Sequence, residues 1–143
     1  MEVKVSWNGP SGMSFRAETG SGHLVNMDGA PEGGGHNLAP RPMEMVLLGT
    51  GGCTAYDVVV ILKKSGQDVR GCEVKLTSER AAVDPKVFTR IHMHFIVRGR
   101  GLKRNLVEHA IRLSHEKYCS ASIMLGKSVC IEHRIEVREA EAA

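Results

Sequence analysis

Residues 45–62 constrain the fold of this chain more than any other segment, because Asp57 is the only charged residue among them. Pro42 and Glu44 precede this stretch, and both residue types are favoured in the first turn of a helix. We therefore predict a helix from about Pro42 to Lys64. A membrane-spanning helix needs about 20 apolar residues, whereas three glycines and the aspartate interrupt these eighteen. We expect no membrane crossing.

A helix that is apolar nearly all round is normally buried on every side. The predicted helix would be about 33 Å long, and a chain of 143 residues has difficulty in covering it completely. A second copy of the chain could supply the missing cover. We therefore expect a homodimer in which the second copy helps to cover this helix.

The remaining segments predict strands and two shorter helices. Strand patterns occupy residues 2–7, 13–18, 23–26, 69–78, 87–97 and 129–137. A helical period covers 102–115, and a second short helix is expected over 116–125. Because helices and strands do not alternate regularly, we predict a single α+β domain over residues 1–143, with N-terminal antiparallel strands and a second sheet after the long helix.

Residues 27–41 form the longest segment without a helix or strand pattern. The segment contains four glycines from Gly29 to Gly35, and prolines at Pro31 and Pro40. Loops of this length inside a compact domain are usually functional or mobile. We expect this loop to form a wall of the active site.

The charge distribution and the first residues exclude some classes of protein. The net charge is +3 and the basic residues are scattered, whereas nucleic-acid-binding domains concentrate them on one face. The first seven residues alternate charged and apolar side chains and lack the apolar core of a signal peptide. We therefore expect a cytoplasmic protein with no nucleic-acid partner, whose four cysteines stay reduced.

Cys53 lies near the middle of the predicted long helix, directly after Gly51 and Gly52. Glycines disfavour a helix but allow another element or a substrate to approach its backbone closely. The pattern equally fits a small core cysteine beside a tight helix contact. Asp57 follows four residues later and projects to nearly the same face; it either belongs to a site or has a structural partner.

A nucleophilic cysteine reacts as the thiolate, and the carboxylate of Asp57 disfavours a second negative charge close by. Cys53 therefore needs a neighbouring cation if it is to react. We take Arg16 and Arg41 as the candidates.

The other three cysteines divide into two groups. Cys119 is a second candidate nucleophile, because His115 and Lys117 are local cations that would lower the pKa of its thiol. Cys72 and Cys130 lie in predicted strands, and we interpret both as structural.

Metal binding is an alternative reading of the histidines. In the strand 87–97, His92 and His94 share one face, opposite the apolar residues, and His115 and Cys119 form an i, i+4 pair. However, the chain has no Cys-x-x-Cys pair and no zinc-finger spacing. We expect neither a metal nor a cofactor.

Two motifs together carry a family resemblance. The first is Pro42-Met43-Glu44 followed by Gly51-Gly52-Cys53-Thr54-Ala55, and the second is Glu116-Lys117-Tyr118-Cys119-Ser120. They resemble the OsmC/Ohr family of thiol-dependent hydroperoxide reductases, and are most similar to its OsmC-like branch. The order of the motifs, their spacing and the order of elements match over essentially the whole chain.

The resemblance implies an OsmC-like fold and an intertwined homodimer, with the long helices at its centre and the active sites at the interface. It also implies that Cys53 attacks a peroxide and becomes a sulfenic acid, which Cys119 resolves as a Cys53–Cys119 disulfide. An organic hydroperoxide would be the substrate, and a dithiol reductant of the lipoyl type would restore the thiols.

One residue departs from the family pattern. In characterised peroxidases of the family, a glutamate ten residues before the first cysteine holds an arginine against the thiolate. Met43 occupies that position here, and Glu44 is displaced by one residue, which turns a helical side chain by about 100°. We retain Glu44 as a site residue. The displacement favours an alternative, a non-catalytic dimeric binding or redox-sensing protein that uses the same apolar pocket.

Overall fold

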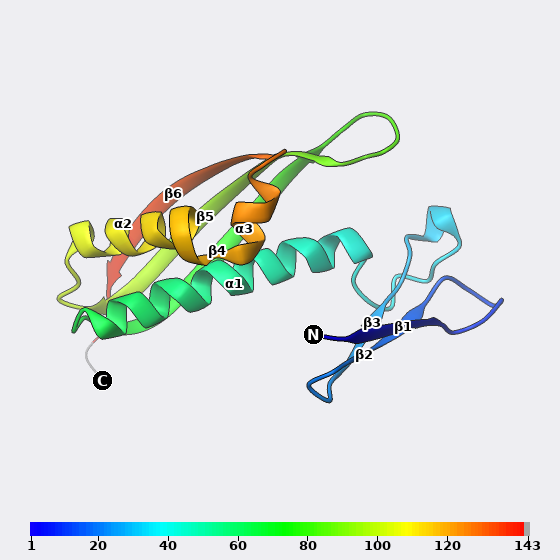
Figure 1. Cartoon of the computed structure of the whole chain (residues 1–143), viewed down its shortest axis with the longest axis horizontal. Helices are drawn as coiled ribbons and strands as arrows, with labels where there is room; N and C mark the ends of the chain where they lie inside the picture. Colours follow the sequence, from blue (N-terminus) through cyan, green and yellow to red (C-terminus); the bar gives the residue numbers. More distant parts are fainter. Residues whose placement is uncertain (142–143) are drawn as a thin grey trace. The chain divides into compact units, whose positions relative to one another are not determined.

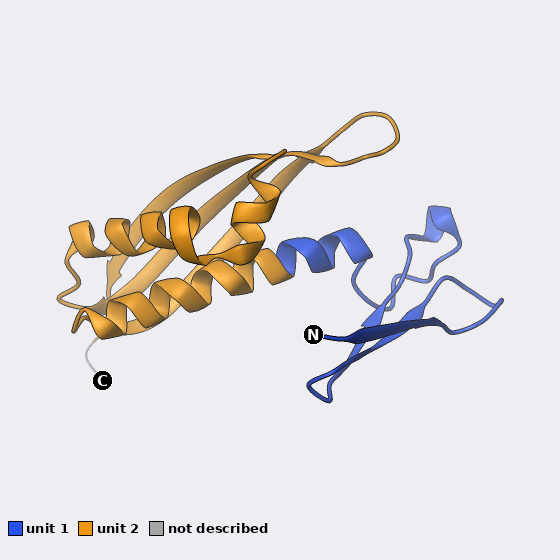
Figure 2. Ribbon diagram, in the orientation of Figure 1, with its two compact units in different colours: residues 1–48 blue, residues 49–143 orange. Residues whose placement is uncertain are grey.

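The computed structural model describes residues 1–141, and its elements follow the predicted order (Figure 1). The α+β class is confirmed. The chain divides into two compact units, Met1–Leu48 and Gly49–Ala143 (Figure 2). The single domain over 1–143 stays a prediction, and residues 142–143 lie outside the described part of the chain.

The first unit contains an antiparallel three-stranded sheet. Its strands are β1 (Val3–Trp7), β2 (Phe15–Thr19) and β3 (Leu24–Met27), in that order. The register places Ala17 of β2 opposite Val5 on one side and Val25 on the other. This arrangement confirms the predicted N-terminal antiparallel strands.

The loop after β3 is organised around Asp28, which is buried. Its carboxylate accepts backbone N–H hydrogen bonds from Leu38, Gly29 and His36. These bonds, the one from Leu38 foremost, hold the pKa of Asp28 below its usual value. The loop also contains a 3₁₀ turn, Pro31–Gly33. The loop therefore has a defined conformation, held by hydrogen bonds to Asp28. Its role as an active-site wall stays a prediction.

The second unit contains a mixed three-stranded sheet. Its strands are β4 (Asp68–Arg80), β5 (Phe88–Arg100) and β6 (Cys130–Glu139), with β5 antiparallel to β4 and parallel to β6. The helices of this unit lie along one face of the sheet (Figure 1). The second sheet predicted after the long helix is confirmed.

The two faces of β5 differ as its sequence predicts. Ile91, Met93 and Phe95 are almost completely buried, whereas His92 and His94 on the other face are partly exposed. The core of the unit combines this apolar face with one side of each long helix. Its buried apolar side chains on these helices are Val58, Leu62, Val107, Ala110 and Ile111.

Helix α1 runs from Pro42 to Lys64, with the bounds that the sequence predicts. Only one side of it is buried in the single chain, whereas Leu48 is 59% exposed and Tyr56 is 72% exposed. The prediction that α1 is buried on every side is therefore wrong for one chain alone, because the sheet covers only one side. By length and composition α1 could also cross a membrane, a criterion that core helices meet as well.

The segment around Cys119 differs from the prediction. Helix α2 (Arg104–Leu113) continues into a π-helical turn (Ser114–Tyr118), and α3 (Ser120–Leu125) follows. Cys119 lies between them in extended conformation, with φ −76° and ψ 99°. The prediction of a continuous helix around Cys119 is therefore wrong. The backbone N–H of Cys119 donates to the Ser114 carbonyl over 2.7 Å, and this bond closes a π-helical turn in place of an α-helical one.

Candidate functional site

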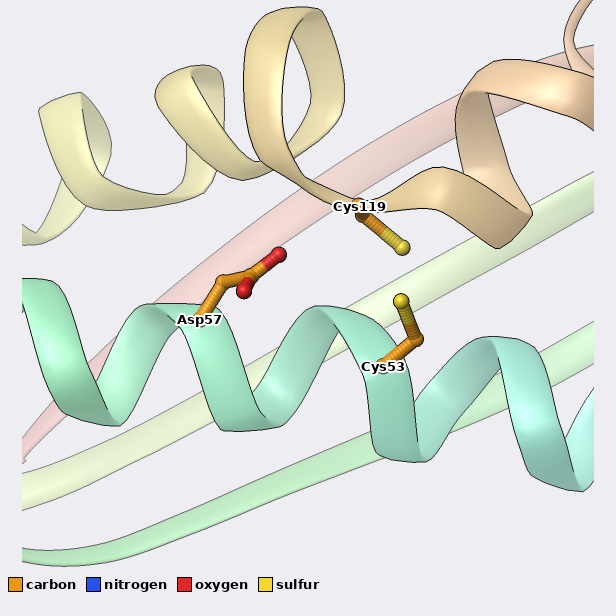
Figure 3. Close-up of side chains that lie close together, drawn as sticks. All are labelled: Cys53, Asp57 and Cys119. Atoms are coloured by element: carbon orange, nitrogen blue, oxygen red, sulfur yellow. The ribbon is translucent and has the colours of Figure 1, made fainter. Parts of the chain in front are cut away.

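Three side chains from two helical segments converge in the second unit. Cys53 and Asp57 project from neighbouring turns of α1, and Cys119 faces them from the start of α3 (Figure 3). The two sulfurs and a carboxylate oxygen of Asp57 all lie within 4.8 Å of one another. Two thiols sixty-six positions apart in the sequence are therefore neighbours in the fold.

The π-helical turn orients the side chain of Cys119 toward α1 (Figure 3). A π turn holds one more residue than an α turn, and such turns are frequent at functional sites. The backbone N–H of Ser122 donates a hydrogen bond to the Cys119 sulfur over 3.4 Å. Cys119 is fully buried, whereas Cys53 is partly exposed. A reactant from solvent therefore reaches Cys53 more easily.

The environment of Cys119 keeps it protonated. Burial is the largest effect and raises the pKa of its thiol, and the neighbouring Cys53 raises it further through a hydrogen bond and charge. The prediction that His115 and Lys117 lower this pKa is wrong. The His115 ring packs edge-on against His133, with centroids 4.4 Å apart, and Lys117 lies over the ring of Tyr118.

A chain of hydroxyl groups holds Asp57. The Ser114 hydroxyl donates to Asp57 Oδ2 over 3.2 Å, and the Thr54 hydroxyl lies 2.8 Å from Ser114 Oγ. Because Ser114 has one hydroxyl proton, Thr54 donates to Ser114 when Ser114 donates to Asp57. Within residues 49–141, no lysine or arginine forms an ion pair with Asp57. Sequence analysis missed Thr54 and Ser114, because residues so far apart carry no spacing signal.

The glycines beside Cys53 have different surroundings. A Cβ on Gly51 would lie 2.7 Å from Leu76 Cδ1 of β4, whereas a Cβ on Gly52 would meet no atom within 4 Å. Gly51 therefore permits close packing of α1 on the sheet, one of the two readings that the sequence left open. Gly52 leaves open space directly before Cys53.

A cleft of 380 Å³ begins at Asp57 and follows the groove between α1 and α2. Apolar side chains on both sides form much of its wall, among them Val60, Ile61 and Leu113. Lys64, His109 and Tyr118 also line it. Of the three converging side chains, Asp57 lines the cleft, whereas Cys53 and Cys119 do not.

Residues 34–134 match the sequence profile of the family described as OsmC-like protein. The chain belongs to this family. Protein YhfA of Escherichia coli K12 is 52% identical over 137 residues, which cover 96% of this chain and 98% of YhfA. The OsmC-like assignment therefore rests on both a family profile and a relative of nearly full length.

Two solved structures have a fold similar to that of this chain. A hypothetical protein from Aquifex aeolicus VF5 is 28% identical, with a TM-score of 0.84 over 98% of this chain and 97% of its own. An organic hydroperoxide resistance protein OsmC from Legionella pneumophila is 18% identical, with a TM-score of 0.70 over 95% and 96% of the two chains. The latter likeness shows the fold alone.

The remaining candidate site residues, the possible cations Arg16 and Arg41 and the displaced Glu44, lie in the first unit. Arg16 is exposed on β2 and forms an ion pair with Glu18 over 2.9 Å. Glu44 Oε1 accepts the backbone N–H of Arg41 over 2.9 Å, and the Arg41 guanidinium donates to the side chain of Asn37. The roles of Arg16, Arg41 and Glu44 beside Cys53 stay predictions.

The other cysteines lie apart from the converged trio on the sheet. Cys72 is half-buried on β4, where burial raises the pKa of its thiol, and Cys130 is exposed at the start of β6. Their structural role stays a prediction.

The two histidines of β5 face acidic residues on the same side of the sheet. A nitrogen of His92 lies 3.8 Å from a carboxylate oxygen of Glu132, and one of His94 lies 4.0 Å from Glu136. Within residues 1–141, three metal-ligand side chains converge at Cys53, Asp57 and Cys119 and not at these histidines.

Proposed function

We propose that this OsmC-like protein is a thiol-dependent peroxidase that reduces organic hydroperoxides. The observation that carries the proposal is the proximity of the Cys53 and Cys119 sulfurs, which lie within 4.8 Å of each other and of Asp57, a residue that lines the cleft. The Legionella pneumophila relative of the same fold, named for organic hydroperoxide resistance, supports the choice of substrate.

The reaction has two protein steps. The Cys53 thiolate attacks one peroxide oxygen, the O–O bond breaks, and the leaving alkoxide takes a proton to become an alcohol, so that Cys53 becomes a sulfenic acid. Cys119 then attacks the Cys53 sulfur, and water leaves as the disulfide forms. A dithiol of the lipoyl type reduces this disulfide and regenerates both thiols.

The two sulfurs are suited to different roles. Cys53 is partly exposed and accepts a hydrogen bond from the buried, protonated Cys119. Cys53 is therefore the attacking thiol and Cys119 the resolving one. The apolar walls of the adjacent cleft favour a fatty or aryl hydroperoxide over hydrogen peroxide.

The active form that we propose is a cytoplasmic homodimer. On β1, the apolar side chains of Val3, Val5 and Trp7 recur at every second residue and are all more than half exposed. Tyr56 on α1 is also exposed. Burying such apolar surface against a second copy of the chain is favourable. The second copy would also cover the side of α1 that is exposed in a single chain.

A second candidate function is a dimeric binding or redox-sensing protein without turnover. The observation that favours it is the hydrogen bond from the Arg41 backbone to Glu44. This bond caps the start of α1 and occupies one carboxylate oxygen of Glu44. The same oxygen is then less available to hold an arginine guanidinium.

A peroxide-consumption assay coupled to a dithiol reductant tests the proposal. We expect the wild type and a Cys130→Ser variant to consume an organic hydroperoxide at similar rates, and Cys53→Ser to lose this activity. Equal rates for the wild type and Cys53→Ser would remove Cys53 from the mechanism. A wild type that consumes no peroxide but carries an apolar ligand after purification would favour the binding function.

A further inference from the structure

We propose that Cys53, Asp57 and Cys119 form a zinc-binding site in the reduced protein. This inference goes beyond the proposed peroxidase and does not depend on it. The three side chains point toward one another across the gap between α1 and α3 (Figure 3). They offer two sulfurs and one oxygen, a donor set that zinc accepts.

The distances suit a tetrahedral ion. Zinc–sulfur bonds of about 2.3 Å and zinc–oxygen bonds of about 2.1 Å place tetrahedral ligands about 3.6–3.8 Å apart. The three atoms here lie within 4.8 Å of one another, so each needs to move by about 1 Å or less to bind one ion. A water molecule completes the four ligands, as in zinc sites with three protein ligands.

The charge of the site also favours a divalent cation. Zinc ligands bind as thiolates and carboxylate, so the trio presents three negative charges to the ion. Within residues 49–141, Asp57 has no lysine or arginine ion-pair partner. Instead, the Ser114 hydroxyl donates a hydrogen bond to its carboxylate. Two thiolates select zinc over magnesium and calcium, which prefer oxygen ligands.

The surrounding hydrogen bonds orient the ligands. Ser114 holds one oxygen of Asp57, and Thr54 in turn donates to Ser114, so the carboxylate is fixed with lone pairs left to bind. The backbone N–H of Ser122 donates to the Cys119 sulfur and stabilises it as a thiolate. Outer contacts of this kind are typical of metal sites.

Zinc and the disulfide exclude each other, because both use the two sulfurs. Oxidation of the thiols to a Cys53–Cys119 disulfide removes two of the three protein ligands. The oxidised chain therefore provides a control with an unchanged sequence, which does not depend on whether a variant folds.

Zinc titration of the reduced protein against a chromogenic chelator tests the site. We expect one ion per chain for the wild type, with loss of binding in Cys53→Ser and Cys119→Ser and after oxidation to the disulfide. Asp57→Asn and Ser114→Ala should each weaken binding by about tenfold or more. Cys72→Ser and Cys130→Ser remove thiols outside the trio and should keep the wild-type affinity.

Cobalt substitution provides a structural readout of the same site. Cobalt bound to the reduced wild type should show the visible and charge-transfer absorption of tetrahedral thiolate coordination, and Cys119→Ser should lose it. The proposal is overturned if reduced wild type binds no zinc in excess metal, or if the disulfide form or Cys53→Ser binds it equally well. None of these measurements uses peroxide, so they succeed or fail independently of the peroxidase.

Discussion

Gly51 of α1 lies so close to Leu76 of β4 that a Cβ on Gly51 would stand 2.7 Å from Leu76 Cδ1. Real side-chain carbons do not approach this closely, so the helix meets the sheet here because one residue lacks a side chain. This contact is two residues from Cys53, and it fixes the depth at which α1 presents that thiol.

A larger side chain at Gly51 should destabilise the second unit. We expect Gly51→Val to lower the free energy of unfolding by about 1–3 kcal/mol, because the branched side chain overpacks the contact with Leu76, and this cost exceeds the small gain in helix propensity over glycine. Urea denaturation measures the change. Gly52→Ala is the matched control, because its Cβ meets no atom within 4 Å. An equal loss in both variants would contradict this explanation.

Removing the resolving thiol should trap the first intermediate. In Cys119→Ser, the sulfenic acid at Cys53 has no thiol to attack it, so we expect it to persist after one equivalent of hydroperoxide. Labelling with a sulfenic-acid reagent and mass spectrometry should locate the label at Cys53, while steady turnover falls at least tenfold. Label at Cys130 instead, or undiminished turnover, would contradict the assigned roles.

The cap of α1 makes a prediction for Glu44. We expect Glu44→Ala to lose about 1 kcal/mol of stability, because the backbone N–H of Arg41 loses its acceptor. Glu44→Gln keeps an acceptor oxygen and should remain close to the wild type in thermal or urea unfolding. If Glu44→Gln is stable but loses peroxide turnover, the carboxylate has a role in the reaction in addition to its cap.

The lowered pKa of His133 predicts that the protein loses stability in mild acid. Burial, with smaller contributions from the charges of His115 and His92, lowers the pKa of His133 to about 4, against 6.5 for an ordinary histidine. Because the unfolded chain binds the proton more readily, stability falls as the pH drops below 6.5 and levels off below about 4. Since His133 is only partly buried, we expect this loss to be about 1–2 kcal/mol.

Urea unfolding of wild type and His133→Phe across this pH range measures that contribution, and the variant should lose less stability in acid. Nuclear magnetic resonance titration of the His133 ring provides a direct check. A midpoint above pH 6 would show that the ring is not held in its neutral form.

The sequence by itself determined most of the elements and their order, with the segment around Cys119 as the exception. The apolar run and Pro42 set the bounds of α1 correctly, and the alternation of residues 91–95 identified the buried face of β5, because local periodicity follows from which side meets the core. The spacing of Cys53 and Asp57 likewise placed both on one face of the helix, since residues four apart lie on adjacent turns.

The tertiary structure decided what faces these residues. The π-helical turn that directs Cys119 toward α1, the Ser114 hydroxyl on Asp57 and the contact of Gly51 with Leu76 all join segments far apart in the chain. No local pattern encodes such contacts, because they depend on how α1, α2 and the sheet pack together. The pKa of Cys119 shows the same limit: its sequence neighbours are basic, yet burial among distant residues keeps its proton in place.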